Sequence, residues 1–243
     1  MTVTLALVLT LLVMVAVNVW VHVGPERWQP VTGPAVAVLL LLVGRWAGLS
    51  WSALGLGRAA LLDGLLWGGA AVALVAAGYG VGVAVPGSRR WFLDARHRVG
   101  PARAAGRALL VVPLGVVVLE EVAFRGVLWG LVEVGRGPLV AAAATSVLFG
   151  VWHVLPAIDG ARANAHDGDG DGDSAGDTAA DAARRAVVLR QVAGTVAFTT
   201  LAGIVFAVLR QQSGSLVAPF LLHWATNGLG ILAAAWAWST QRD

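Results

Sequence analysis

Seven apolar runs make up most of this 243-residue chain, and their length restricts it to one class of structure. A helix of about 20 apolar residues crosses the hydrocarbon core of a bilayer. Hydrophobic residues account for 58% of the chain and charged residues for only 13%, which is typical of an integral membrane protein. We therefore predict an all-α, polytopic helix bundle in the cell membrane, with a single transmembrane domain over residues 1–243. The runs are residues 2–23, 34–49, 61–85, 109–134, 138–156, 187–209 and 216–239.

Each run predicts one transmembrane helix, which gives seven helices, or eight if Gly228 and Gly230 divide the last run. The first run is too long for the apolar part of a signal peptide, so we expect it to remain as a helix. Arginines collect in residues 87–107 and 162–190. Because cytoplasmic loops carry an excess of positive charge, both segments are expected in the cytoplasm. Seven helices then place the N-terminus outside and the C-terminus inside.

The charge and the cysteine content exclude several other kinds of protein. The net charge of +3 comes from arginines placed between apolar runs, which is a topology signal and not a nucleic-acid patch. The expected partner of the surface is therefore the lipid bilayer, with no nucleic acid. The chain has no cysteine, which excludes disulfides, thiolate metal sites and a cysteine nucleophile. Histidine and carboxylate chemistry remains.

A glycine- and aspartate-rich stretch at residues 159–181 interrupts the apolar pattern. Its composition cannot supply a packed core, so we expect a flexible acidic linker in the cytoplasm. The alternation that begins at Asp167 copies the start of an EF-hand loop. The twelfth position is Thr178, where a calcium loop needs a bidentate glutamate, so the linker interpretation is preferred.

Three ionisable side chains, Glu120, Glu121 and Arg125, lie inside the fourth apolar run. Each ionised group near the centre of a bilayer costs roughly 2.5 to 3.5 kcal/mol on insertion scales, so the three need partners or a function. On a helix Glu121 and Arg125 are four residues apart with the acid first, which favours an ion pair. Glu120 points about 100° away from that pair and is left without a cation along the helix. We therefore expect a structural pair and one free carboxylate.

Two later apolar runs add polar side chains that are rare in membrane interiors. His153 follows Phe149 by four residues near the end of the fifth run, beside Trp152. His223 and Asn227 are four residues apart in the last run, so a helix places the imidazole and the carboxamide on one face. A histidine beside a tryptophan is often an interfacial anchor, and an asparagine often only joins helices. Their joint occurrence with Glu120 favours a functional site.

The order of these motifs resembles that of the CAAX protease and bacteriocin-processing family, which includes the type II CAAX prenyl endopeptidases and the bacterial Abi proteins. The matching motifs are Glu-Glu-x-x-x-Arg from Glu120, Phe-x-x-x-His ending at His153 and His-x-x-x-Asn from His223. The resemblance covers about residues 109–229 and includes Gly-Ser-Leu-x-Ala-Pro at residues 214–219. It implies an intramembrane endopeptidase that hydrolyses a peptide bond of a membrane-associated peptide or protein substrate.

The resemblance also implies a role for each site residue. Glu120 would be the general base that activates water, helped by His153, and Glu121 with Arg125 would be the structural pair. His223 and Asn227 would donate to the oxyanion of the tetrahedral intermediate.

As an alternative, His153 and His223 would bind a divalent metal, zinc before others, together with a carboxylate. The family's metalloprotease classification favours a metal, but the chain lacks the helical zinc signature His-Glu-x-x-His.

Two non-proteolytic interpretations stay open from the sequence. A membrane scaffold or bacteriocin-immunity factor would keep the buried polar residues only to fix the register of its helices. A proton-coupled carrier would use them as a relay, although no paired broken helices occur in corresponding halves of the chain. Replacing Glu120 separates an enzyme from a scaffold, because only the enzyme would lose activity while keeping its fold.

Overall fold

The structure, a computed structural model, describes residues 2–93, 98–166 and 178–240, and these residues form helices and turns without a strand among them. The all-α prediction is therefore confirmed. The main helices are α1 (Val3–Val23), α2 (Gln29–Trp46), α3 (Leu61–Ala84), α4 (Pro86–Arg89), α5 (Pro101–Gly106), α6 (Val118–Glu121), α7 (Trp129–Arg136), α8 (Pro138–Trp152), α9 (Val154–His166), α10 (Thr178–Ser213), α11 (Val217–Trp224) and α12 (Gly230–Ser239). Three π-helical segments, η5 (Arg107–Val117), η6 (Val122–Leu128) and η7 (Ala225–Leu229), join some of them.

Six helical stretches in the described residues are long and apolar enough to cross a membrane. Each overlaps one of the predicted apolar runs. The last stretch is one span because η7 continues the helix from α11 into α12, so Gly228 and Gly230 do not divide this run into two helices. The six stretches are Val3–Val23, Gln29–Trp46, Arg58–Ala84, Pro138–Ala161, Arg184–Ser213 and Val217–Ser239.

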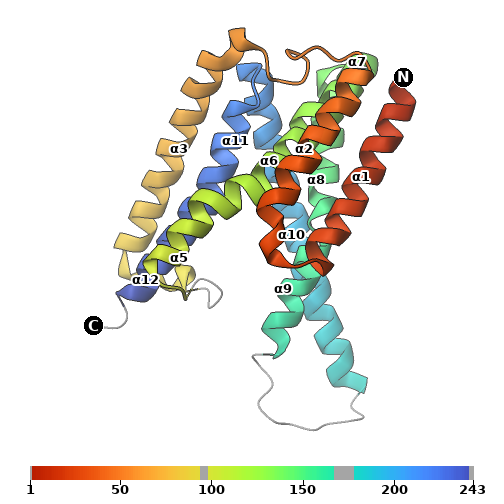
Figure 1. Cartoon of the computed structure of the whole chain (residues 1–243). Coiled ribbons are helices and arrows are strands. Elements are labelled where there is room, and N and C mark those ends of the chain that lie inside the picture. The colour runs from red at the N-terminus through yellow and green to blue at the C-terminus, as the bar shows by residue number, and fades with distance from the viewer. Residues whose placement is uncertain (1, 94–97, 167–177, 241–243) are drawn as a thin grey trace.

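The fourth predicted run lies within residues 101–136, which follow an unbroken helical path through α5, η5, α6, η6 and α7. Pro113 lies in η5, where its missing N–H group interrupts the regular hydrogen-bond ladder. The path changes direction between α5 and α7, which lie toward opposite ends of the bundle (Figure 1). Glu120 and Glu121 thus occupy a short α-helical turn between two π-helical segments, a distortion that is frequent at functional sites.

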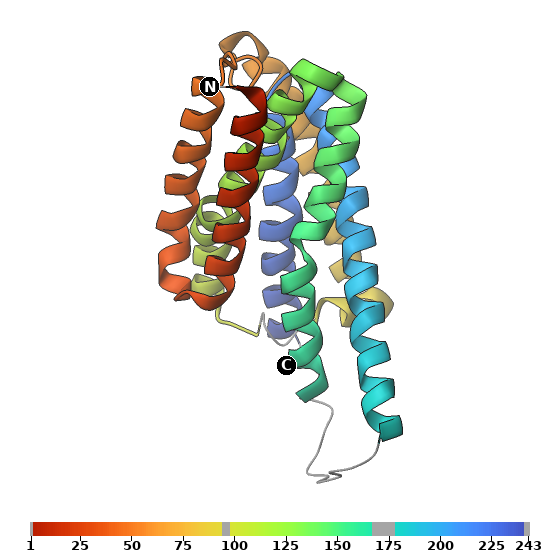
Figure 2. The same ribbon diagram turned by 90° about the vertical axis from the view of Figure 1, so that its right-hand side faces the viewer.

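Both ends of the stretch expected as a linker, residues 159–181, are helical, because α9 extends to His166 and α10 begins at Thr178. The fifth run was expected to end near Pro156, but only a break at His153 separates α8 from α9. Pro156 lies in the first turn of α9, where a proline removes no helical hydrogen bond. α9 and the first half of α10 pack together and project beyond the other helices (Figures 1 and 2). The EF-hand-like residues 167–177 lie outside the described residues.

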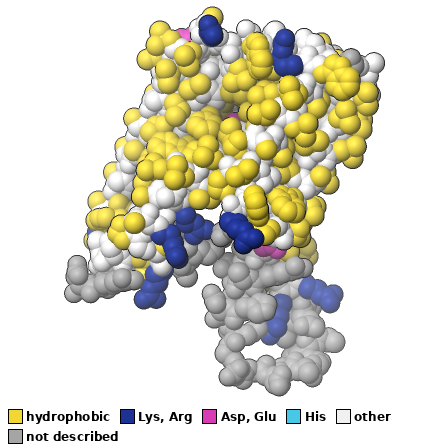
Figure 3. All heavy atoms as spheres, in the orientation of Figure 1, with side chains coloured by type: hydrophobic (Ala, Val, Ile, Leu, Met, Phe, Trp, Pro, Cys, Tyr) yellow, Lys and Arg dark blue, Asp and Glu magenta, His cyan; other side chains and the backbone are white. Residues whose placement is uncertain are grey.

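On the face shown in Figure 3, apolar side chains cover the middle of the bundle, and arginine side chains lie toward its two ends. The connection after α3 and the first turns of α10 lie at the same end, as expected for two arginine-rich cytoplasmic segments (Figure 1). α1 begins at the opposite end of the bundle and α12 ends at the arginine-rich end (Figure 1). The described part of the molecule therefore has the surface of a protein surrounded by lipid.

Two glycines allow α8 and α10 to pack closely in the interior. A Cβ atom at Gly150 would overlap the hydroxyl of Thr200, and one at Gly203 would lie 3.0 Å from the Cα of Ser146. Small residues at such contacts let membrane helices approach each other. The close approach brings the rings of Phe149 and Phe206 to a centroid distance of 5.9 Å beside Arg125.

Candidate functional site

Three charged side chains are buried in the middle of the bundle. Glu120 is 6% exposed, Glu121 1% and Arg125 0%. α6, which carries both glutamates, lies between the two ends of the bundle (Figure 1). Charges in such an interior are stable only if opposite charges and hydrogen bonds compensate for the lost hydration.

Arg125 is held by a carboxylate, a backbone carbonyl and aromatic rings. Its Nη1 donates to Oε1 of Glu121 at 3.3 Å, and its Nη2 donates to the carbonyl oxygen of Gly203 at 3.4 Å. The guanidinium carbon lies 4.2 Å from the ring centroid of Phe149 and 4.8 Å from that of Phe206, which are cation–π contacts. The structure therefore forms the Glu121–Arg125 ion pair that the sequence predicts.

The turn after α10 directs the last helix toward this ion pair. Gly214 has φ +64°, a conformation that residues with a Cβ rarely adopt. The side chain of Ser215 then accepts a hydrogen bond from the backbone N–H of Val217 at 3.2 Å, in the first turn of α11. This local structure explains the Gly-Ser-Leu-x-Ala-Pro segment that precedes His223, and it sets where the imidazole enters the core.

His223 joins the two glutamates and is 4% exposed. Its Nδ1 lies 2.7 Å from Oε1 of Glu121, and its Nε2 lies 3.7 Å from Oε2 of Glu120. The ring stacks on Phe206 at a centroid distance of 5.0 Å. Glu121 therefore contacts both Arg125 and His223, so its contacts extend beyond the two-residue pair that the spacing predicted.

The two carboxylate oxygens of Glu120 have different surroundings. Oε1 accepts a hydrogen bond from the indole N–H of Trp152 at 2.9 Å. Oε2 is buried and has no hydrogen-bond partner within the described residues, although Nε2 of His223 is nearby. Glu120 is therefore oriented by one oxygen and has the other available, which matches the free carboxylate expected from the sequence.

His153 lies at the break between α8 and α9 and is half-buried. Its Nδ1 forms a 2.7 Å hydrogen bond with the carbonyl of Phe149, and its ring packs against the Phe149 ring at 4.6 Å. The ring of Phe149 also contacts His223, at 5.9 Å, so both histidines pack on one phenylalanine. The residue next to His153, Trp152, makes the direct contact with Glu120.

Asn227 lies in η7, one helical turn after His223. Its side chain is exposed, whereas His223 is buried. The two residues follow each other along one helix as predicted, but only His223 enters the charged cluster.

Sequence reasoning missed two residues of the site, Trp152 and Asn18. Trp152 was considered only as the neighbour of His153, yet it donates to Glu120 and packs edge-on against Phe124 at 5.7 Å. Asn18 of α1 donates to the backbone carbonyl of Trp152 at 3.1 Å. A polar residue inside the first apolar run was the available signal for Asn18. For Trp152 no spacing could have identified the partner, because Glu120 is 32 residues away in the sequence.

The expected metal site can be compared with this geometry. Within the described residues, no group of three or more histidine, aspartate or glutamate side chains is arranged to hold a metal ion. His153 and His223 lie against the same phenylalanine ring, and the latter is already bound to a carboxylate through Nδ1. Among the described residues, the structure therefore does not gather the predicted ligands, two histidines and a carboxylate, into one metal-binding group.

One proton would balance the charges of the cluster. Two ionised glutamates and one guanidinium leave a single net negative charge in an apolar interior. A proton on Nε2 of His223 or on Oε2 of Glu120 would make the group neutral, and these two atoms face each other at 3.7 Å. Such an arrangement places a proton acceptor beside a proton donor, which general acid–base chemistry requires.

A comparison with known protein families finds a match in the part of the chain that contains the buried charged cluster. The protein-family profile for type II CAAX prenyl endopeptidase Rce1-like proteins matches residues 104–229, which is a little over half of the chain. No curated protein and no solved structure matches the chain. The matched family consists of membrane proteases, and the six apolar helices make this chain a multi-pass membrane protein. The chain thus belongs to the type II CAAX prenyl endopeptidase Rce1-like family.

Proposed function

We propose that the protein is an intramembrane endopeptidase that hydrolyses a peptide bond of a membrane-associated substrate, with Glu120 as the general base. The observation that carries this proposal is the asymmetry of Glu120. One oxygen is fixed by Trp152, while the other is buried, without a hydrogen bond in the described part of the chain, and 3.7 Å from His223. Oε2 of Glu121 is likewise buried without a hydrogen bond in the described residues, but the Oε1 of Glu121 is shared by Arg125 and His223, whereas Glu120 has no arginine partner.

We propose that a reacting water molecule binds between Oε2 of Glu120 and Nε2 of His223. Oε2 and Nε2 of His223 are too far apart for a direct hydrogen bond, but a single water can lie about 2.8 Å from both. Glu120 would take the proton of this water as the oxygen attacks the peptide carbonyl. The low dielectric of the bundle strengthens each of these electrostatic contacts.

His223 is proposed to supply the proton that the reaction needs at its other end. Its Nδ1 is fixed by Glu121, which leaves Nε2 directed toward Glu120 and the reacting water. A protonated Nε2 donates to the oxyanion and then to the leaving amine. Glu121 stabilises the imidazolium, and Arg125 holds Glu121 in position. Asn227 and His153, both partly accessible at the edges of the cluster, are proposed to contact the substrate.

The proposed mechanism uses only side chains of the chain itself. The ligand set expected for zinc does not come together among the described residues, so no step is assigned to a metal ion. General acid–base catalysis of this kind contributes about 10² to 10⁴ in rate. The contribution of Glu120 should therefore be measurable as a loss in turnover.

The test is cleavage by purified protein in liposomes, with prenylated and non-prenylated membrane-anchored peptides and mass spectrometry of the products. Glu120→Gln keeps an oxygen that accepts from Trp152 but removes the base, so turnover should fall about 10²- to 10⁴-fold. Its melting temperature should stay within a few degrees of the wild type. The matched control is Asp63→Asn, an exposed carboxylate on α3 outside the cluster, which should cleave normally. Wild-type turnover in Glu120→Gln would remove Glu120 from the role of base.

We further propose seven membrane spans, with residues 101–136 as the additional one. The unbroken helical path and the positions of α5 and α7 at opposite ends of the bundle support this (Figure 1). The chain has no cysteine, so single cysteines at Ser88 and Arg136 can be labelled in intact cells with an impermeant thiol reagent. Seven spans predict labelling at position 136 only. Equal behaviour of both positions would show that residues 101–136 do not cross the bilayer.

A further inference from the structure

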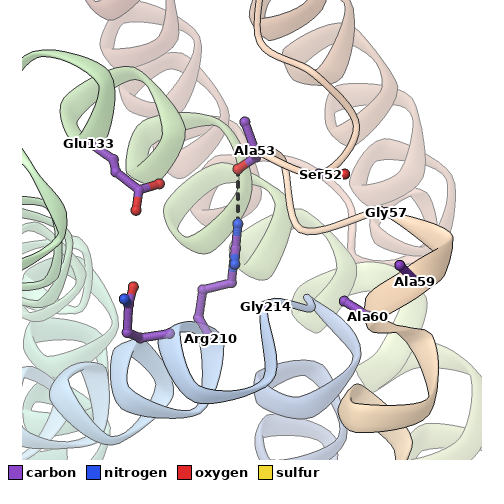
Figure 4. Close-up of a pocket in the computed structure, with 9 residues that line it drawn as sticks. Ser52, Ala53, Gly57, Ala59, Ala60, Glu133, Arg210 and Gly214 are labelled. Atoms are coloured by element: carbon purple, nitrogen blue, oxygen red, sulfur yellow. Dashed lines mark hydrogen bonds between the residues drawn. The ribbon is translucent and has the colours of Figure 1, made fainter.

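A polar cavity lies at the end of the bundle opposite the arginine-rich connection after α3. Its volume is about 410 Å³, and Figure 4 shows that it lies between the connection from α2 to α3, the end of α7 and the end of α10. Small residues form one wall and leave the space open. The lining consists of Ser52, Ala53, Gly57, Ala59, Ala60, Glu133, Arg210, Gln211 and Gly214.

The cavity lies at the level where the membrane spans end. One membrane span begins at Arg58, and another ends at Ser213. The residues that line the cavity lie near these two span ends, at the edge of the hydrocarbon region. Lipid headgroups occupy this level in a bilayer. α3 continues from the cavity wall with the strongly exposed apolar side chains of Leu62 and Leu66, which are 66% and 63% exposed. A lipid with its headgroup in the cavity would lay its acyl chains along these leucines.

Arg210 forms the positive part of the cavity and is only 5% exposed. Its Nε donates to the carbonyl of Arg125 at 3.1 Å, and its Nη2 donates to the carbonyl of Ala53 at 2.9 Å, the contact drawn in Figure 4. Both contacts are with neutral acceptors, and in the described part of the chain its Nη1 donates to none. The guanidinium is thus fixed in place while its charge remains unmatched by an ion pair.

Glu133 forms the negative part of the cavity and comes from a different helix (Figure 4). Its Oε2 accepts a hydrogen bond from the indole of Trp129 at 3.0 Å. Among the described residues Glu133 and Arg210 form no ion pair with each other, although both line the same space. A ligand that carries one positive and one negative group would therefore contact Glu133 and Arg210 at the same time.

We propose that this cavity binds the phosphoethanolamine headgroup of a membrane lipid. Arg210 would bind the phosphate, for which the planar guanidinium is suited, and Glu133 would accept hydrogen bonds from the primary ammonium. The quaternary ammonium of choline has no N–H to donate to Glu133. A headgroup with only negative charge would be repelled by Glu133, so the two charges also select against it.

The experiment measures the melting temperature of the purified protein in a neutral detergent as dioleoyl phosphatidylethanolamine, phosphatidylcholine or phosphatidylglycerol is added. A ligand that binds only the folded state at about 100 times its Kd raises the melting temperature of a protein of this size by roughly 5 to 10 °C. We expect this rise with phosphatidylethanolamine only. Soluble phosphoethanolamine, tested at the same concentration, should give a much smaller shift, because it lacks the acyl chains that contact α3.

Two variants test the assigned residues, each with a matched control. Glu133→Gln keeps an acceptor for Trp129 but removes the charge, and Ala59→Leu fills the cavity; both should lose the shift. Arg136→Gln, at the same end of the bundle, and Ala70→Leu, on the exposed face of α3, should keep it. Equal shifts with phosphatidylcholine, or a full shift in Glu133→Gln and Ala59→Leu, would overturn the proposal. An equal shift with soluble phosphoethanolamine would overturn a lipid as the ligand.

Discussion

Two buried arginines, Arg125 and Arg210, each share a region with a glutamate, but the regions are built in opposite ways. Arg125 contacts Glu121 at 3.3 Å and is enclosed by phenylalanine rings, which makes a closed cluster in the middle of the bundle. Within the described residues, the polar contacts of Arg210 are with backbone carbonyls and a tryptophan ring, and a cavity separates it from Glu133. The charge of Glu121 is therefore balanced by its contact with Arg125. Glu133 and Arg210 do not contact each other, so both charges are available to a ligand.

The difference indicates what each region can do. A closed cluster holds side chains in one geometry, which is what proton transfer between Glu120 and His223 requires. An open pair of opposite charges can bind a ligand but has no reactive group beside it. The two regions are connected, since Arg210 donates to the backbone carbonyl of Arg125. Variants that change one arginine at a time should therefore separate the contribution of the closed cluster to stability from that of the cavity beside Arg210.

The largest effect is expected for Arg125→Met. This change leaves Glu121 buried without its cation, and such a loss typically costs about 3 to 5 kcal/mol. For a chain of this length that corresponds to a fall in melting temperature of roughly 6 to 20 °C. The comparison variant Arg210→Met leaves two carbonyls without donors and should cost about 1 to 3 kcal/mol. If Arg210→Met were the more destabilising in detergent, the closed cluster would not be the stronger structural element.

A double variant sharpens the same contrast. Glu121→Gln combined with Arg125→Met removes both buried charges, so part of the stability lost in either single variant should return. Activity should stay lost, because Glu121 also holds Nδ1 of His223. The measurement is a double-mutant cycle of melting temperatures together with peptide cleavage. Additive losses in the cycle would mean that Glu121 and Arg125 do not interact in the folded protein.

A smaller effect is expected for Trp152→Phe. Phenylalanine keeps the packing against Phe124 but removes the donor to Oε1 of Glu120, a hydrogen bond to a charged group worth about 1.5 to 3 kcal/mol. If that bond orients the base, kcat should fall roughly 10- to 100-fold while KM stays near the wild-type value. The control is Trp91→Phe, since Trp91 is 78% exposed. An unchanged kcat in Trp152→Phe would limit this residue to packing.

Most of the fold follows from the sequence because the bilayer imposes it. The apolar runs predict the six spans to within a few residues at most ends, since the length of an apolar run sets the length of a membrane helix. The helix that continues past Pro156 was missed, because residues 157–166 are not apolar and their helix depends on packing against α10. The open cavity was missed as well, since Glu133 and Arg210 are far apart in the sequence and meet only through the tertiary structure.

The candidate site was predictable residue by residue but not in its contacts. Spacing along one helix correctly paired Glu121 with Arg125, because both belong to the same helical path. Spacing could not show that His223, 102 residues later, shares that glutamate. Spacing also could not show that Trp152, the neighbour of His153, donates to Glu120.

The smallest expected effect is that of a metal chelator, for which we expect no loss of activity. Arg125 and one proton would balance the charges of the inner cluster, and the described residues contain no group of three or more histidine, aspartate or glutamate side chains that could hold zinc. Cleavage by purified protein should therefore be the same with and without excess EDTA or 1,10-phenanthroline. Stability should be unchanged too, because a structural metal would raise the melting temperature by mass action. Activity that disappears with chelator and returns with zinc would show that His153 or His223 binds a metal during the reaction, and that the closed cluster rearranges to permit it.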